Sequence, residues 1–395
     1  MPDPRPATSP VGERGRLRLL QLAALISTCD RFAIAPLIVV IAADLDVPFP
    51  AAAGVASAYF LAYGAMQPVW GMVSDRIGRV RAMRLALLGA TVAGIGSAVA
   101  PDLLLLGATR VLAGASFAAL IPASLVYVGD SWPEEVRQRP LADVMAASSL
   151  GIAAATAGAG ALADLAGWRA VPAVTAAAAV ALWVALRRLP EPDRLPPSGS
   201  PLRSIGRVLA QRWARVVLLF ALVEGAVVLG LLTYLAPAVQ ALGATAALAG
   251  TVAASYGVGA LLFTRVVRRL VGRLTAATLA AIGGAFLVAA WGVPALGVSI
   301  VTVAVAGLLV GGSWAFLHST LQTWATQVVP KERATTVALF AAMLFLGSGL
   351  GTALAAHPAG AGAYPELFRA GLVAALPLGI AVAAARARYA RATRT

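Results

Sequence analysis

Residues 274–330 read LTAATLA AIGGAFLVAA WGVPALGVSI VTVAVAGLLV GGSWAFLHST LQTWATQVVP and contain no aspartate, glutamate, lysine or arginine. A helix that crosses a bilayer needs about 20 mostly apolar residues, so this stretch is too long for one such helix and long enough for two. The turn between them is expected near Gly292-Val293-Pro294, because glycine and proline interrupt helices. An uncharged run of this length predicts a protein embedded in a membrane.

The same length criterion, applied outward from this stretch, predicts twelve spanning helices. Residues 225–264 also lack charge and are expected to turn near Leu242-Gly243. Of the 395 residues, 60% are hydrophobic and 12% are charged, about half the charged share of an average soluble domain. The predicted fold class is therefore an all-α membrane protein. Its spans are expected at residues 17–43, 51–73, 82–100, 103–128, 141–164, 168–188, 214–241, 245–265, 275–293, 295–320, 335–356 and 363–385.

The basic residues divide unequally between the two ends of these spans. All but four of the 31 lysines and arginines fall at one end, the exceptions being Arg169 and Arg369 at the other end and Arg31 and Arg110 within spans. Basic residues gather on the cytoplasmic side of membrane proteins, so both termini are expected in the cytoplasm of a bacterial-type cell, with the chain in its inner membrane. The net charge of +14 is thereby assigned to topology and not to nucleic-acid binding.

A proline-rich, charged stretch separates two apolar regions of nearly equal length. It predicts a cytoplasmic linker, with a short surface helix from Leu202, between two six-helix halves related by pseudo-symmetry. Arg14, Arg16 and Arg18 precede an apolar stretch, as in a signal peptide, but Asp30 and Arg31 interrupt it. The first span is therefore expected to be retained and not cleaved. The expected order is a cytoplasmic tail (1–16), a first half (17–188), the linker (189–213), a second half (214–386) and a cytoplasmic tail (387–395).

Few residues of this chain could support metal, nucleotide or covalent chemistry. There is one cysteine, Cys29, and the two histidines, His318 and His357, have no metal-ligand spacing. The single lysine, Lys331, is followed by glutamate, so no phosphate-binding loop is present. We therefore expect no metal, no cofactor and no enzymatic activity. A membrane-embedded enzyme or receptor remains the alternative of another class.

One loop carries a recognisable motif. Residues 71–81 read GMVSDRIGRVR, which resembles the signature Gly-x-x-x-Asp-Arg-x-Gly-Arg-(Arg/Lys) of the major facilitator superfamily, although Val80 replaces the last basic residue. A degenerate echo, RRLVGR, follows the eighth predicted span at residues 268–273. The resemblance implies that the loop latches the outward-facing state and relays charge to an acid at the end of the fourth helix. The latch residues would be Gly71, Asp75, Arg76, Gly78, Arg79 and Asp130. The alternative is that their charges act only as topology signals.

Four ionisable residues fall inside predicted spans: Asp30, Arg31, Arg110 and Glu224. A charge at mid-bilayer costs about 2.5–3.5 kcal/mol, so each is expected to find a partner or face a cavity. Neighbours on a helix point about 100° apart, so we expect Asp30 to pair with Arg110 and Arg31 with Glu224. Because desolvation favours the neutral form of an acid, Asp30 and Glu224, with Arg110, are candidates for proton coupling. Static pairing that only locks helices together is the alternative.

Two polar and aromatic stripes recur at helical spacing. Tyr59, Tyr63 and Gln67 share one face of the second span, and Trp314, His318 and Gln322 share one face of the tenth. Such faces suit an amphipathic organic substrate, and ordinary helix packing is the alternative. The predicted substrate cavity therefore comprises Asp30, Arg31, Tyr59, Tyr63, Gln67, Arg110, Glu224, Trp314, His318 and Gln322.

The expected activity is secondary active transport by alternating access, most simply proton-coupled efflux of a small organic molecule such as a drug or metabolite. Residues 110–114, RVLAG, resemble the fourth-helix motif of the drug:proton antiporter branch. Thr156 stands where the fifth-helix motif of that branch has a proline, which keeps uptake by proton symport or facilitated diffusion open as an alternative. The expected partners are the substrate, protons and the lipid bilayer, and the transporter is expected to be a monomer.

Overall fold

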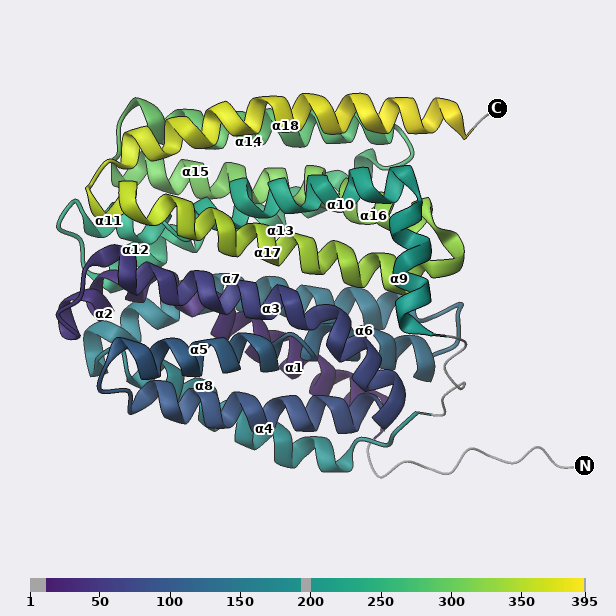
Figure 1. Ribbon diagram of the computed structural model, residues 1–395, viewed down its shortest axis with the longest axis horizontal. Coiled ribbons are helices and arrows are strands. Elements are labelled where there is room, and N and C mark those ends of the chain that lie inside the picture. Colours follow the sequence, from purple (N-terminus) through teal and green to yellow (C-terminus); the bar gives the residue numbers. More distant parts are fainter. Residues whose placement is uncertain (1–11, 193–199, 394–395) are drawn as a thin grey trace, which may run out of the picture.

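The computed structural model describes residues 12–192 and 200–393, and within these ranges the chain forms helices joined by turns, without a β-strand. Twelve helical stretches there are long and apolar enough to cross a membrane, which confirms the predicted fold class. The helices run side by side along the long axis of the molecule (Figure 1).

The first half contains six spans. They are α1 (Glu13–Ala33) with η1 (Ala35–Leu37) and α2 (Ile38–Asp44), α3 (Phe49–Ile77), α4 (Arg79–Ala98), α5 (Leu103–Phe117) with α6 (Leu120–Ser131), α7 (Gln138–Ala166), and α8 (Ala170–Ala185) with η2 (Leu186–Arg188).

The short helix α9 (Pro201–Ala210) precedes the second half, as expected for the linker. The remaining six spans are α10 (Arg212–Glu224) with η3 (Gly225–Gly230) and α11 (Leu235–Gln240), α12 (Ala246–Ala253) with α13 (Ser255–Leu270), α14 (Ala276–Leu296), α15 (Ile300–Ser313) with η4 (Trp314–His318) and α16 (Ser319–Val328), η5 (Pro330–Glu332) with α17 (Arg333–Gly360), and α18 (Tyr364–Ala392).

The two halves share part of their pattern of interruptions. The first, fourth, seventh and tenth spans are each broken into shorter helices, as is the eighth, whereas the second and fifth are continuous. In the seventh and tenth spans the interruptions are the π-helical segments η3 and η4. Such segments are commonly found at functional sites, so they direct attention to these two helices.

We call the end of the bundle where α1 begins and α18 ends the terminal end, and the opposite end the loop end (Figure 1). The halves meet closely from the loop end to mid-span. Gln240 Nε2 donates to the Pro36 carbonyl at 3.0 Å, and the Ala247 amide donates to Asp164 Oδ2 at 2.8 Å. Ser57 Oγ of α3 donates to the Gly349 carbonyl of α17 at 2.7 Å, and at mid-span Tyr63 of α3 contacts Phe345 of α17 with ring centroids 4.5 Å apart. This joint holds the two halves together.

Most boundaries agree with the sequence, and two do not. The turn at Gly243 is confirmed, and its φ of 87° suits a glycine. The turn expected near Pro294 is wrong, because α14 continues to Leu296 and the next helix begins where Ser299 and Thr302 form a reciprocal capping box. The second is at residue 387, where a tail is expected to begin, because α18 continues to Ala392; that this segment lies in the cytoplasm stays a prediction.

Parts of three predicted segments lie outside the described residues. These are residues 1–11 of the first tail, residues 193–199 of the linker and residues 394–395 of the last tail, together with Arg5, Arg194 and Arg394. Within the described part the first helix begins at Glu13, a few residues earlier than expected.

Candidate functional site

An ion pair lies buried in the middle of the first half. Arg110 of α5 donates to both carboxylate oxygens of Asp30 of α1, at 3.1 and 2.5 Å, and Thr175 Oγ1 of α8 donates to Asp30 Oδ1 at 3.2 Å. Asp30 is 3% exposed and Arg110 is 5% exposed. A two-pronged guanidinium–carboxylate contact of this kind is a strong, directional form of ion pair. The predicted partnership of Asp30 and Arg110 is confirmed.

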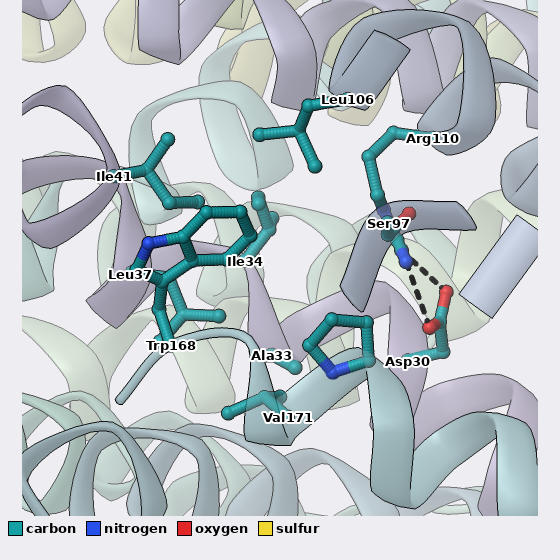
Figure 2. A pocket seen from close by; sticks show the side chains of 11 residues that line it. Asp30, Ala33, Ile34, Leu37, Ile41, Ser97, Leu106, Arg110, Trp168 and Val171 are labelled. Atoms are coloured by element: carbon teal, nitrogen blue, oxygen red, sulfur yellow. Dashed lines mark hydrogen bonds and ion pairs between the residues drawn. The ribbon is translucent and has the colours of Figure 1, made fainter. Parts of the chain in front are cut away.

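The small pocket beside this ion pair belongs to one half only. Figure 2 shows it lined by residues that include Leu37, Leu106 and Val171, from the first, fourth and sixth spans. Asp30 and Arg110 therefore face the interior of the first half in this state, and not a cavity between the halves. Their predicted place in the substrate cavity is not supported by this arrangement.

Arg31 takes a different direction from Asp30 and lies where the halves meet. Its guanidinium donates to the Tyr63 hydroxyl at 3.0 Å and lies 4.9 Å from the ring centre of Phe345, on α17 of the second half. No ion pair joins Arg31 to Glu224 among the described residues, so that predicted pairing is wrong. Adjacent residues on a helix point about 100° apart, which explains the two directions. Glu224 contacts a different base.

That base is His318. Glu224 Oε2, at the end of α10, lies 3.1 Å from His318 Nδ1 in η4, and their side chains are 1% and 9% exposed. Glu224 directly precedes η3, and His318 closes η4, so both π-helical segments adjoin this pair. The other carboxylate oxygen, Glu224 Oε1, is buried without a hydrogen-bond partner in the described part of the chain. The pair joins the seventh and tenth helices of the second half.

Aromatic rings connect the second-half pair to the interface between the halves. The rings of Trp314 and His318 stack with centroids 3.6 Å apart, and Tyr256 lies edge-on to Trp314 at 6.4 Å. Tyr256 in turn contacts Phe32 of the first half at 6.1 Å. Gln322 does not join this cluster: it is exposed, one turn nearer the terminal end, where other residues fill the buried face of α16.

The second-span stripe is buried, as a site or a packing surface would require. Tyr59 lies beneath the Arg110 guanidinium at 4.9 Å, and Tyr63 contacts Phe345 with ring centroids 4.5 Å apart. Tyr59 and Tyr63 stack on each other at 6.2 Å, and Gln67 is 4% exposed. The stripe thus lies between the Asp30–Arg110 pair and Arg31.

The signature loop forms a charge network at the terminal end. Arg79 pairs with Asp75 and, through Nε at 3.0 Å, with Asp130 at the end of the fourth span. Arg76 lies in the last turn of α3, beside Asp75. The contact with Asp130 matches the charge relay that the motif implies. Whether the network latches one state of the molecule stays a prediction.

Gly78 is required in this loop, whereas Gly71 is not. Gly78 has φ of 112° and ψ of 159°, a conformation that side chains rarely allow, and the carboxylate of Glu191 occupies the place of its absent Cβ. A Cβ on Gly71 would meet nothing within 4 Å, so no close helix contact requires a glycine at this position. The echo in the second half has its own turn glycine, Gly272, with φ of 84°.

The sequence did not identify Glu191 as part of this site, although its side chain contacts the loop. Its carboxylate accepts from the backbone amide of Arg79 and, at 3.3 Å each, from those of Val80 and Arg81, at the start of α4. A carboxylate there satisfies amides that a helix start leaves open and favours the positive end of the helix. The available signal was an acid shortly after the basic end of the sixth span.

A second pocket lies between the halves, next to Arg31. It combines side chains of the first half, among them Phe60 and Thr156, with Leu229, Thr233 and Tyr256 of the second. Its volume of about 20 Å³ is room for roughly one water molecule. No group of three or more histidine, cysteine, aspartate or glutamate side chains within residues 12–192 and 200–393 could hold a metal ion.

Comparison with known proteins gives partial relatives in mycobacteria. The chain is 32% identical over 133 residues to a triacylglyceride transporter of Mycolicibacterium smegmatis, and 30% identical over 133 residues to one of Mycobacteroides abscessus. Each alignment covers 33% of this chain, and only 24% and 26% of the respective relative. The match thus spans about a quarter of the length of these proteins.

Solved structures agree over nearly the whole chain. A bacterial homologue of the human lysosomal transporter Spinster superposes with a TM-score of 0.72 at 20% identity, covering 95% of this chain and 97% of the other. A nucleoside transporter superposes with a TM-score of 0.78 at 13% identity, covering 94% and 99%. The sequence model of the Major Facilitator Superfamily matches residues 20–352. With its twelve spans and this match, the chain is a transporter and belongs to the Major Facilitator Superfamily.

Proposed function

We propose that this transporter exports a small, largely apolar organic molecule in exchange for protons, by alternating access of its two halves. One observation carries the proposal. Each half buries one acid at mid-span, Asp30 or Glu224, in contact with a base from another helix. If a conformational change separates an acid from its partner, a proton would neutralise the unpaired buried charge, so each pair is suited to couple proton movement to a change of state.

Protonation would change the energy of each pair and thereby the balance between conformations. A proton on Asp30 leaves the buried Arg110 without a counter-charge, which costs several kcal/mol in a setting of low dielectric. A proton on Glu224 or His318 alters the contact that joins the seventh and tenth helices. A ligand shifts a conformational equilibrium only through its different affinity for the two states, and the proton would act here as that ligand.

The proposed direction depends on the orientation of the bundle. We infer that the terminal end faces the cytoplasm, because nearly all arginines fall at that end of the spans. The halves are joined from the loop end to mid-span, which in this orientation corresponds to closure toward the outside. A substrate would then be collected from the cytoplasm or the inner leaflet.

The relatives support an apolar cargo. The partial matches are triacylglyceride transporters, and the walls of the inter-half pocket are mostly aliphatic and aromatic. A lipid-like molecule is therefore the first class to test.

The test uses everted membrane vesicles with an imposed proton gradient and a pH-sensitive dye. A panel of single-chain amphiphiles, neutral antibiotics and amphipathic cations is added to vesicles with the parent protein, Asp30→Asn or Glu224→Gln. We expect at least one compound to dissipate the gradient with the parent protein, at a rate at least about tenfold above either variant.

The matched control is Glu366→Gln, which removes a surface acid in a pair that is 60% exposed on each side. Such a pair contributes little, so this variant should behave like the parent. Equal dissipation by the parent and both buried-acid variants would contradict the proposal.

Uptake is the second candidate, favoured by one residue. Thr156 takes the place of the antiporter-motif proline, and its hydroxyl donates to the Ile152 carbonyl at 3.3 Å within a continuous α7. Accumulation of a labelled compound in right-side-out vesicles, with no response in everted ones, would favour uptake over export.

A further inference from the structure

Arg31 is a buried cation without a counter-ion among the described residues. It is 7% exposed, and its polar partner is the neutral Tyr63 hydroxyl. Its other close neighbours are the ring faces of Phe32, Tyr63 and Phe345, at 4.9–5.1 Å. Aromatic faces attract a cation but do not neutralise it. The Nε atom of the guanidinium is buried and makes no hydrogen bond within the described residues.

The two acids at this depth are already engaged. Asp30 is held by both arms of Arg110, and Glu224 contacts His318. They are the only buried aspartate and glutamate in the part of the chain that the structure describes. A negative charge for Arg31 therefore has to come from outside the described protein.

The pocket beside Arg31 is equipped to receive such a charge. The hydroxyl-bearing residues Thr156, Thr233 and Tyr256 line it together with Arg31. The hydroxyl of Tyr256 is buried and has no hydrogen-bond partner in residues 12–192 and 200–393. The Thr156 and Thr233 hydroxyls donate to backbone carbonyls four residues earlier, so the guanidinium and the Tyr256 hydroxyl are the donors left to match the oxygens of a carboxylate or phosphate. The remaining lining is apolar, including Phe60 and Leu229.

We propose that Arg31 and Tyr256 form a subsite for the anionic head group of the transported molecule, which rests on the proposed function. The cargo class is then a single-chain amphiphile with a carboxylate or phosphate head. Arg31 belongs to the first half and Tyr256 to the second, so the head group is contacted by both halves. The pocket holds only about one water molecule in this state, so the head group enters as the halves move apart.

Binding of four twelve-carbon probes tests the proposal: dodecanoate, dodecyl phosphate, dodecanol and dodecyltrimethylammonium. The full chain is placed in nanodiscs of zwitterionic lipid, and thermal stabilisation is measured against probe concentration. We expect one or both anions to stabilise the protein, and the neutral and cationic probes not to do so. Arg31→Gln should weaken binding of the anions about 30-fold or more, because it removes one partner of a buried charge pair. Arg31→Lys should retain part of the affinity.

Two further variants provide a control and an independent test. Arg203→Gln removes the same charge from the exposed face of α9 and should leave binding unchanged. Tyr256→Phe removes only the unpartnered hydroxyl, and it should weaken anion binding several-fold even if Arg31→Gln fails to fold. Equal binding of dodecanol and the anions, or unchanged anion binding in Arg31→Gln or Tyr256→Phe, would overturn the inference.

Transport of the same probes separates this inference from the proposed function. Proton-driven export of dodecanol or dodecyltrimethylammonium, without export of the anions, would overturn the anionic subsite and leave the exporter standing. Arg31-dependent binding of the anions without proton-linked movement would support the subsite and count against proton-coupled export.

Discussion

The motif of the signature loop includes two glycines, but the structure requires a glycine at only one of the two positions. Gly71 and Gly78 are equivalent in the motif, yet only Gly78 has a backbone conformation and a neighbour that exclude a side chain. Glu191 explains the difference, because its carboxylate fills the space above Gly78 and caps α4. The motif gave no indication of this distant partner, since the two segments are separated by four spans.

We predict that Gly78→Ala destabilises the protein and Gly71→Ala does not. The alanine at 78 must move the Glu191 carboxylate and adopt a conformation that costs about 1–3 kcal/mol. The alanine at 71 meets open space and should be neutral within about 0.5 kcal/mol. Thermal unfolding in detergent measures both.

A third variant, Glu191→Ala, tests whether the Glu191 carboxylate stabilises the start of α4. Glu191→Ala should lower the unfolding temperature through loss of the cap, worth about 1 kcal/mol, while Glu135→Ala at an exposed site should not. If Gly78→Ala and Gly71→Ala unfolded at the same temperature, the assignment of backbone strain to Gly78 would be wrong.

At the scale of elements, apolar length and charge predicted the number of spanning helices, but not where they are interrupted. The twelve spans follow from the runs of apolar residues, and the Asp30–Arg110 pair follows from the cost of a buried charge. The π-helical segments η3 and η4 have no local signal in the sequence, because they depend on packing between helices. Arg31 and Glu224 were paired wrongly for the same reason: periodicity gives the direction of a side chain on its helix, but not which neighbour it reaches.

We predict that η4 tolerates the loss of one residue better than the regular helix before it. A π-helical turn contains one residue more than the α-helix around it. Deletion of Ala315 should convert η4 to regular helix and leave α15 and α16 in place. The protein should fold, with a small decrease in unfolding temperature. It should lose transport, because His318 would no longer be held against both Trp314 and Glu224.

Deletion of Ala304 from α15 is the matched control. It rotates the rest of that helix by about 100° against its neighbours, so it should prevent folding. Size-exclusion chromatography and thermal unfolding distinguish the two deletions. If both deletions destabilised the protein equally, η4 would serve only to fit neighbouring helices together and would have no separate role.

For the whole molecule, the contacts between the halves are unevenly distributed along the bundle. From the loop end to mid-span, Gly160 of α7 packs against the Ala246 carbonyl and Gly250 of α12 against the Thr156 carbonyl. On the other side of the bundle, Ser57 contacts Gly349 in the loop-end part of α3, and Tyr63 contacts Phe345 at mid-span. Alternating access requires that this joint can open and a corresponding one form at the terminal end.

We predict that Gly160→Ala shifts the molecule toward a state that is open at the loop end. The added methyl group would overlap the Ala246 carbonyl, which belongs to the backbone and cannot rotate away. Gly158→Ala, on the same helix, meets nothing within 4 Å and is the matched control. A closure weakened by about 1–3 kcal/mol is enough to change the ratio of two states by roughly 5- to 150-fold.

Spin-label distances measure the shift. In a Cys29→Ser background, which removes the single native cysteine, one label pair is placed at the loop end through Ala43→Cys and Leu242→Cys, both exposed positions. A second pair is placed at the terminal end through Arg139→Cys and Arg269→Cys, also exposed. Gly160→Ala should lengthen the first distance and shorten the second, since the halves rock as two bodies about the site. If only the first distance lengthened, the halves would be separating locally and not exchanging access. If neither changed, the α7–α12 contact would not be what holds the loop end closed.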